Sequence, residues 1–144
     1  MLYYNTNLEF TGATLLSAED AENFLTRDER EYEFNWWLCS PGSYRNYVCY
    51  VRNHGAVDYT GCSFNYGFCC IRPALMLSNS GTFKIGDIFN IGNHYFKIIS
   101  PNLAWLYKQD IGGNIFDEKS NKYNKSHAKQ VINEWYEKLM EEIK

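Results

Sequence analysis

Cysteine and histidine are the residues of this chain that most readily bind metals or act as nucleophiles. The cysteines are Cys39, Cys49, Cys62, Cys69 and Cys70, and the histidines are His54, His94 and His127. No two cysteines have the C-x₂-C spacing that is typical of a structural zinc site. We therefore expect no metal site. The number of cysteines is odd and no signal peptide is evident, so we expect reduced and mostly buried thiols.

The same residues bear on catalysis. Cys69 and Cys70 are adjacent, so in a strand they would point to opposite faces. A cysteine–histidine nucleophile pair remains an open alternative, because such partners meet only in space. The chain has no Gly-rich phosphate loop, no H-E-x-x-H and no G-x-S-x-G motif. The sequence favours a non-catalytic protein without a cofactor.

A polar and aromatic segment between two apolar anchors is the strongest candidate for a binding site. The anchors are WWLCSPG at 36–42 and IRPAL at 71–75. Tyrosine, asparagine and arginine are typical of adaptable protein-binding surfaces. The candidate binding residues are Tyr44, Arg45, Asn46, Tyr50, Arg52, Asn53, His54, Tyr59, Phe64, Asn65 and Tyr66, in a wider set that includes Tyr47, Ser63 and Phe68.

A purely structural role is the alternative for this segment. Only alternate residues of a strand share a face, so about half of these side chains would fill the core. Calcium binding is not supported, because it requires clustered oxygen ligands and Asp58 is the segment's only acid. We therefore expect a protein partner.

The charge pattern argues against nucleic acid. The formal net charge is −3, and residues 17–33 are strongly acidic. The basic run of Lys119, Lys122, Lys125 and Lys129 is typical of a solvated face. A nucleic-acid surface needs more positive charge with interleaved aromatic residues, and the 36–75 segment holds only Arg45, Arg52 and Arg72 against Asp58. The N-terminal MLYYNTNLEF has no basic region, and no apolar run is long enough to span a membrane. We expect a cytoplasmic protein.

Short elements must position the candidate residues in one domain, 1–144, of the α+β class. Ser17 and Ser126 are candidate N-caps for two helices, one ending near Thr26 and one beginning near His127. Residues 47–51 and 56–59 alternate as strands do, and 81–107 predicts a meander of strands broken by Gly86 and Gly92. We expect these two helices to pack on small antiparallel sheets with long loops.

Three motifs carry a resemblance to a known family. LLSAEDAENFL (15–25), WWLCSPG and IRPAL resemble LLS-x-E-E-A, W-L-R-S-P-G and G-V-R-P-A-L of an uncharacterised bacterial and phage family. That family is similar to the formylglycine-generating-enzyme-like branch of the C-type-lectin fold. The resemblance implies a compact C-type-lectin-like domain with ligand-facing loops. Cys39 replaces the family's arginine, whereas Arg72 is retained, and we expect a structural role for it.

The order of the two halves is reversed relative to that family. Residues 13–78 resemble its C-terminal half, whereas GDIFNIGNHYFKII (86–99) and YNKSHAKQVINEWYEKL (123–139) resemble elements of its N-terminal half, here within 82–144. A circular permutation joined through 78–81 explains this order, since domain termini often lie close together. A truncated unit of a tandem array is the alternative.

Two functions follow from these patterns. The first is a recognition module of bacterial or phage origin that docks on a protein through its 43–70 surface. The second is a phage-encoded intracellular inhibitor of a host defence enzyme, comparable to an anti-CRISPR protein, with the acidic 17–33 stretch as a decoy. The salt dependence of binding distinguishes the two functions, because an acidic interface weakens with ionic strength more steeply than an aromatic one.

Overall fold

The computed structural model describes residues 7–143 and has the predicted α+β character. Residues 1–6, which begin the N-terminal segment considered above, lie outside the described part, as does Lys144. The elements are β1 (Glu9–Thr14), α1 (Ala18–Phe24), α2 (Arg27–Arg30), β2 (Asn35–Pro41), β3 (Tyr47–Val51), β4 (Val57–Ser63), β5 (Cys69–Cys70), β6 (Ala74–Asn79), β7 (Ile88–Ile91), β8 (His94–Ser100), β9 (Leu103–Leu106), a 3₁₀ turn (Tyr123–Lys125) and α3 (His127–Glu141).

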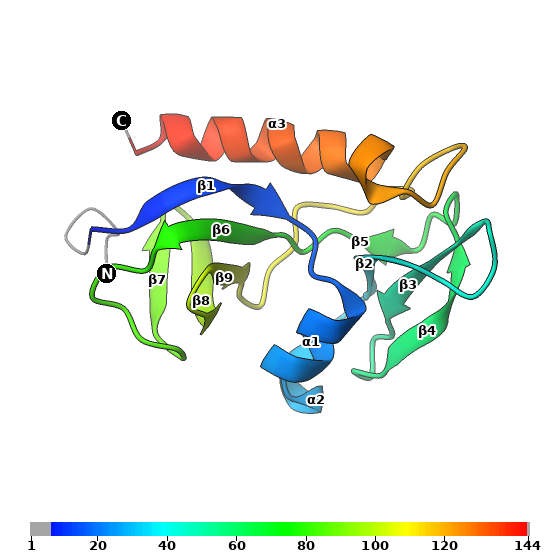
Figure 1. The fold of residues 1–144 in the computed structure, drawn as a ribbon, viewed down its shortest axis with the longest axis horizontal. Coiled ribbons are helices and arrows are strands. Elements are labelled where there is room, and N and C mark those ends of the chain that lie inside the picture. The colour runs from blue at the N-terminus through cyan, green and yellow to red at the C-terminus, as the bar shows by residue number, and fades with distance from the viewer. Residues whose placement is uncertain (1–6, 144) are drawn as a thin grey trace.

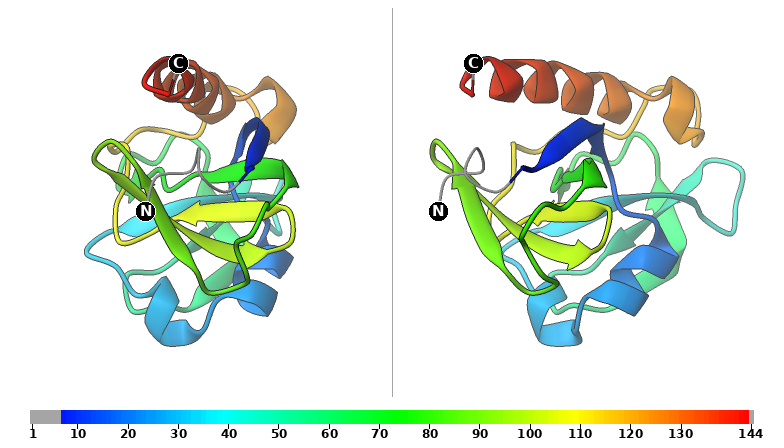
Figure 2. Two further views of the ribbon diagram at one scale, coloured as in Figure 1. Left: turned by 90° about the vertical axis from the view of Figure 1, so that its left-hand side faces the viewer. Right: turned by 60° about the vertical axis from the view of Figure 1, so that its left-hand side comes forward.

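The strands form two sheets that lie beside each other (Figure 1). The five-stranded sheet has the order β1-β6-β9-β8-β7, and all of its pairs are antiparallel. The four-stranded sheet has the order β4-β3-β2-β5, in which β5 runs parallel to β2. Only Ile71, Arg72 and Pro73 connect β5 with β6, so the chain passes directly from one sheet to the other. The turned views show α3 lying along β1, on the side of the molecule away from α1 and α2 (Figure 2).

The four-stranded sheet is covered on both faces. In β2, Trp36 and Leu38 pack with α1, whereas Trp37 joins the larger cluster that contains Phe116 and the inner face of α3. Strand β3 alternates in the same way, with Cys49 and Val51 on one face and Val48 and Tyr50 on the other. The larger cluster also includes residues of β6, β8 and β9. The two sheets therefore share one continuous hydrophobic core.

Local sequence explains both N-terminal helices. The Ser17 hydroxyl accepts a hydrogen bond from the Asp20 backbone N–H, which confirms it as the N-cap of α1. The helix ends near Thr26 as predicted, since α1 ends at Phe24. The second helix, for which Thr26 is the N-cap, was not predicted. Thr26 and Glu29 form a reciprocal capping box there, which satisfies two backbone donors. Phe24 is 40% exposed and does not share the buried face of α1.

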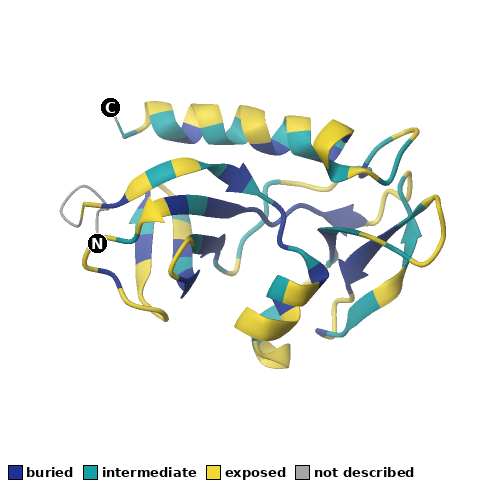
Figure 3. Cartoon of the chain, viewed as in Figure 1, coloured by how far each residue is buried: buried dark blue, intermediate teal, exposed yellow. Residues whose placement is uncertain are grey.

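The second half follows the predicted pattern with one correction. Strands β7, β8 and β9 form the expected meander, but residues 82–85 form no strand and only Phe83 among them is buried. Ser126 caps α3, whose inner stripe of Ala128, Ile132 and Leu139 is buried, while its outer face is exposed (Figure 3). Within residues 7–143, no helix combines the length and hydropathy of a membrane span.

Candidate protein-interaction surface

The structure brings one group of the predicted binding residues together at the far end of the four-stranded sheet. The β2–β3 loop and the β4–β5 loop meet there, because the Phe64 backbone N–H donates to the Asn46 carbonyl at 2.9 Å. We call this the loop surface and define it by the exposed residues Tyr44, Arg45, Asn46, Asn65, Tyr66 and Phe68. The β2–β3 loop projects at the right-hand end of Figure 1.

Aromatic side chains dominate the exposed area of the loop surface. Tyr44, Tyr66 and Phe68 are 61%, 40% and 72% exposed. The Tyr44 ring packs edge-on against Tyr47 with centroids 5.0 Å apart, and the Tyr66 ring lies 4.9 Å from that of Phe68. These pairs hold large apolar rings in fixed positions while leaving much of their area in contact with water.

Phe64 anchors the loop surface from below. Its side chain is half-buried against the main core, and its carbonyl accepts hydrogen bonds from the backbone N–H groups of Phe116 and Asp117. Asn121 adds a further tie by donating to the Tyr47 carbonyl at 3.1 Å. The prediction placed Phe64 among the binding residues, but its contacts assign it to positioning the loop.

A cavity of about 260 Å³ lies at the edge of the loop surface. Phe68 and Phe34 line it on its exposed side, and Cys69, Cys70 and Asp110 line it further in. Phe34 is 47% exposed and was not predicted. Its sequence position gave no signal, because the alternation Phe34, Trp36, Leu38 places it with two buried residues.

The residues of the β3–β4 turn lie at the opposite end of the sheet and contact α2. The Tyr32 N–H donates to the Asn53 carbonyl, and the Arg27 guanidinium contacts both the carbonyl and the Nδ1 of His54. Arg52 pairs with Asp58 at 2.6 Å. Arg52, Asn53 and His54 therefore hold the β3–β4 turn against Asp58, Tyr32 and Arg27. The predicted binding residues do not form one continuous surface.

Two predicted tyrosines lie elsewhere. Tyr50 is 7% exposed and belongs to the main core, so its assignment as a binding residue was wrong. Burial, followed by the nearby Asp58 charge, raises the pKa of Tyr50 to about 12. Tyr59 is exposed on β4, but it lies beside Glu22 of α1 and away from the loop surface.

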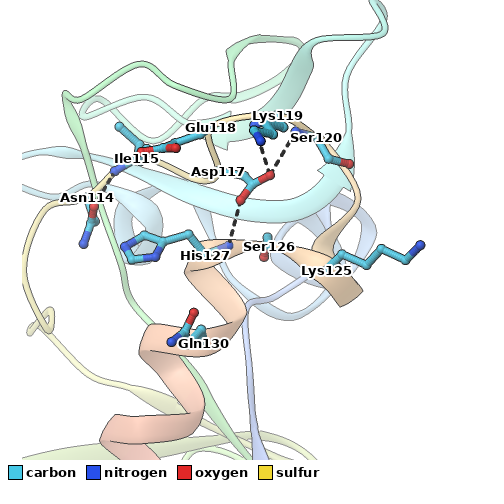
Figure 4. A pocket seen from close by; sticks show the side chains of 10 residues that line it. All are labelled: Asn114, Ile115, Asp117, Glu118, Lys119, Ser120, Lys125, Ser126, His127 and Gln130. Atoms are coloured by element: carbon cyan, nitrogen blue, oxygen red, sulfur yellow. Dashed lines mark hydrogen bonds between the residues drawn. The ribbon is translucent and has the colours of Figure 1, made fainter.

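A second, more polar cavity of about 680 Å³ lies where α3 begins (Figure 4). The Asp117 carboxylate points into this region and accepts hydrogen bonds from the backbone N–H groups of Lys119, Ser120 and His127. The Ser126 hydroxyl donates to the Tyr123 carbonyl and accepts from the Lys129 N–H. Both groups are therefore engaged in ordering the loop and the helix start.

The cysteines occur as free thiols. Cys49, Cys69 and Cys70 are buried, and Cys39 and Cys62 are half-buried. Cys69 and Cys70 contribute to different core clusters, as the prediction of opposite faces requires. Cys62 and Cys69 hydrogen-bond to each other, which lowers the pKa of Cys62 and raises that of Cys69. Among residues 7–143, no three His, Cys, Asp or Glu side chains gather closely enough to hold a metal ion.

Comparison with known proteins relates the chain to a described family. A family model described as a domain of unknown function (DUF6273) matches residues 4–79, more than half of the chain. No curated protein and no solved structure matches.

Proposed function

This chain belongs to the DUF6273 family, which has no assigned function, and we propose that it is a non-catalytic protein-binding module. The partner docks on the loop surface together with Phe34 and inserts an apolar side chain into the 260 Å³ cavity beside Phe68. The proposal narrows the predicted 43–70 surface to the residues that meet in space and are exposed.

The observation that carries this proposal is the gathering of exposed aromatic side chains around a cavity. Phe68 is 72% exposed and Phe34 is 47% exposed, although each immediately precedes a strand, β5 and β2 respectively. Exposed apolar patches bordered by polar residues are typical of protein interaction sites. Arg45, Asn46 and Asn65 supply that polar border.

The expected energy is sufficient for a specific contact. Complete burial of a phenylalanine side chain stabilises by about 1.5–3 kcal/mol. Scaled by the exposed fractions of Phe34 and Phe68, this burial gives about 2–4 kcal/mol for the pair. Loss of Phe68 alone should therefore weaken binding by about tenfold.

The intracellular inhibitor of a host defence enzyme is the second candidate, because α1 and α2 present an acidic face. Exposed carboxylates on these helices include Glu19, Glu22, Asp28 and Glu31. Arg27 and Arg30 offset part of this negative charge, and both donate hydrogen bonds to backbone carbonyls of the core or the β3–β4 turn. An inhibitor that docks by charge would use this face rather than the loop surface.

The C-type-lectin-like relationship and the circular permutation belong to the same proposal. They are supported by the motif order in the sequence and by a fold with short helices, small sheets and a loop-rich end. Origin in a phage or mobile element and residence in the cytoplasm rest on the sequence resemblance and composition alone.

The test is affinity capture from bacterial and phage-infected lysates with three forms of the protein. The test variant is Tyr66→Ser/Phe68→Ser. Its matched control is Ile88→Ser/Tyr95→Ser, which removes comparably exposed apolar side chains from the five-stranded sheet. We expect a partner that the wild type and the control retain and that the test variant loses. Each variant must unfold at the wild-type denaturant concentration.

Two results would contradict the proposal. Equal retention by the test variant and the control would show that the loop surface is not the site. A partner released by moderate salt and lost in Glu19→Gln/Glu22→Gln, but kept in Tyr66→Ser/Phe68→Ser, would assign binding to the acidic face.

A further inference from the structure

Arg72 lies at the junction of the two sheets with its guanidinium enclosed by aromatic rings. Its side chain is 1% exposed, and its Cζ lies 4.1 Å from the Tyr32 ring centroid and 4.2 Å from that of Trp105. Nε donates to the Gln109 carbonyl at 3.0 Å, as the predicted structural role requires. Burial lowers the pKa of Arg72 to about 10, so the group remains charged at neutral pH.

Two buried donors next to this stack have no partner. Within residues 7–143, neither Nη1 of Arg72 nor Nε1 of Trp105 has a hydrogen-bond acceptor. Both residues line one cavity of about 220 Å³ between α2 and β9. Buried polar groups are nearly always hydrogen-bonded, and a charged donor loses most when it is not. Two such donors in one cavity indicate that an acceptor binds there.

The charged residues around the cavity favour a ligand that carries both a negative and a positive charge. Asp28 and Glu31 of the α2 region and Lys108 are the exposed charged residues of the cavity lining. The third carboxylate of the lining, Glu29, is already paired with Lys97. A simple dianion would gain from Arg72 but would be repelled by Asp28 and Glu31, so the site suits a ligand that carries both charges.

The cavity also limits the size of the ligand. Its volume is below the roughly 300–1,000 Å³ of pockets that hold drug-sized molecules. Rings of Tyr32, Trp105 and Tyr107 form its walls, which favours an apolar group beside the charged ones. A free amino acid has this size and this arrangement of charges.

We propose that the cavity between α2 and β9 is a binding site for a free α-amino acid. The carboxylate accepts hydrogen bonds from Nη1 of Arg72 and Nε1 of Trp105, and the ammonium group faces Asp28 and Glu31. The site uses none of the loop-surface residues, so its test is independent of the proposed protein-binding function.

The test follows the indole N–H resonances by ¹⁵N–¹H correlation spectroscopy while each common L-amino acid is added separately. The chain has four tryptophans, and the Trp105→Phe variant assigns the resonance of Trp105. We expect a saturable shift of the Trp105 signal with at least one amino acid. The amide and the N-acetyl derivative of that amino acid should each bind about tenfold more weakly or not at all, since each loses one charge.

Substitution of the exposed carboxylates Asp28 and Glu31 tests the contact with the ammonium group without changing the core. Asp28→Asn/Glu31→Gln should weaken amino-acid binding about two- to fivefold, as expected for exposed charge pairs. Glu137→Gln/Glu141→Gln, on the exposed face of α3, is the control and should bind as the wild type does. The proposal is overturned if no amino acid shifts the Trp105 signal. It is equally overturned if the amide and the N-acetyl derivative bind as well as the parent amino acid.

Discussion

Replacing three glycines by alanine should have three different effects, because the backbone and the space around each glycine differ. Gly61 has φ +86°, and a Cβ there would lie 2.5 Å from the Val48 carbonyl oxygen on the neighbouring strand. Gly112 has φ +111°, but nothing lies within 4 Å of its Cβ position. Gly67 has no positive φ and is equally open. The series separates backbone strain from steric overlap.

The magnitudes follow from these two terms. A left-handed conformation costs an alanine about 1–2 kcal/mol, which is the whole expected cost of Gly112→Ala. Overlap with a packed neighbour adds about 1–3 kcal/mol, so Gly61→Ala should lower the free energy of unfolding by about 2–5 kcal/mol. Gly67→Ala should be neutral or stabilising by up to about 1 kcal/mol, because alanine restricts the unfolded chain.

Urea denaturation at one pH measures all three variants. The midpoints should fall in the order Gly67→Ala, Gly112→Ala, Gly61→Ala, with similar slopes for each. Equal costs for Gly61→Ala and Gly112→Ala would show that β3 and β4 do not approach as described. Because β4 leads into the loop surface, Gly61→Ala should also weaken partner capture more than Gly112→Ala.

Three further outcomes are expected. Burial raises the pKa of Asp58, but the Gly61 N–H and Arg52 outweigh it and lower the pKa below 3.8. The ionised Asp58 carboxylate therefore stabilises the folded state fully above pH 3.8, and this contribution is lost as pH falls through the lowered pKa. Asp58→Asn should flatten the decline in the free energy of unfolding below about pH 4. An unchanged decline would contradict this reasoning. Iodoacetamide at neutral pH should label half-buried Cys62 before Cys70, because burial raises the pKa of Cys70 to about 12. Peptide mass spectrometry measures the order of labelling, and faster labelling of Cys70 would refute the prediction. Arg30→Ala removes donors to the carbonyls of Gly55 and Leu25 and should destabilise by about 2–3 kcal/mol in urea, against no change for exposed Arg45→Ala.

Sequence reasoning succeeded where the signal was local. Ser17 and Ser126 were recognised as caps because the side chain of an N-cap acts within its own first turn. The α3 stripe and the three-stranded meander were also readable, since each depends on periodicity within a short segment.

Exposure within the four-stranded sheet could not be predicted. Both faces of β3 are covered, so the alternation of Val48, Cys49, Tyr50 and Val51 does not distinguish inside from outside. The burial of Tyr50 and the exposure of Phe34 follow from this ambiguity. The contact between α2 and the β3–β4 turn joins residues about 25 positions apart and leaves no local pattern.

The junction between the sheets determines how the molecule can move. The connector between β5 and β6 has three residues, and its central side chain, Arg72, stacks on rings from before β2 and from β9. Rotation of one sheet against the other would require the guanidinium to leave Tyr32 or Trp105 and enter a less favourable environment. The junction is thus a rigid joint rather than a hinge. The two sheets should tumble as a single body, with one rotational correlation time for the backbone amides of both.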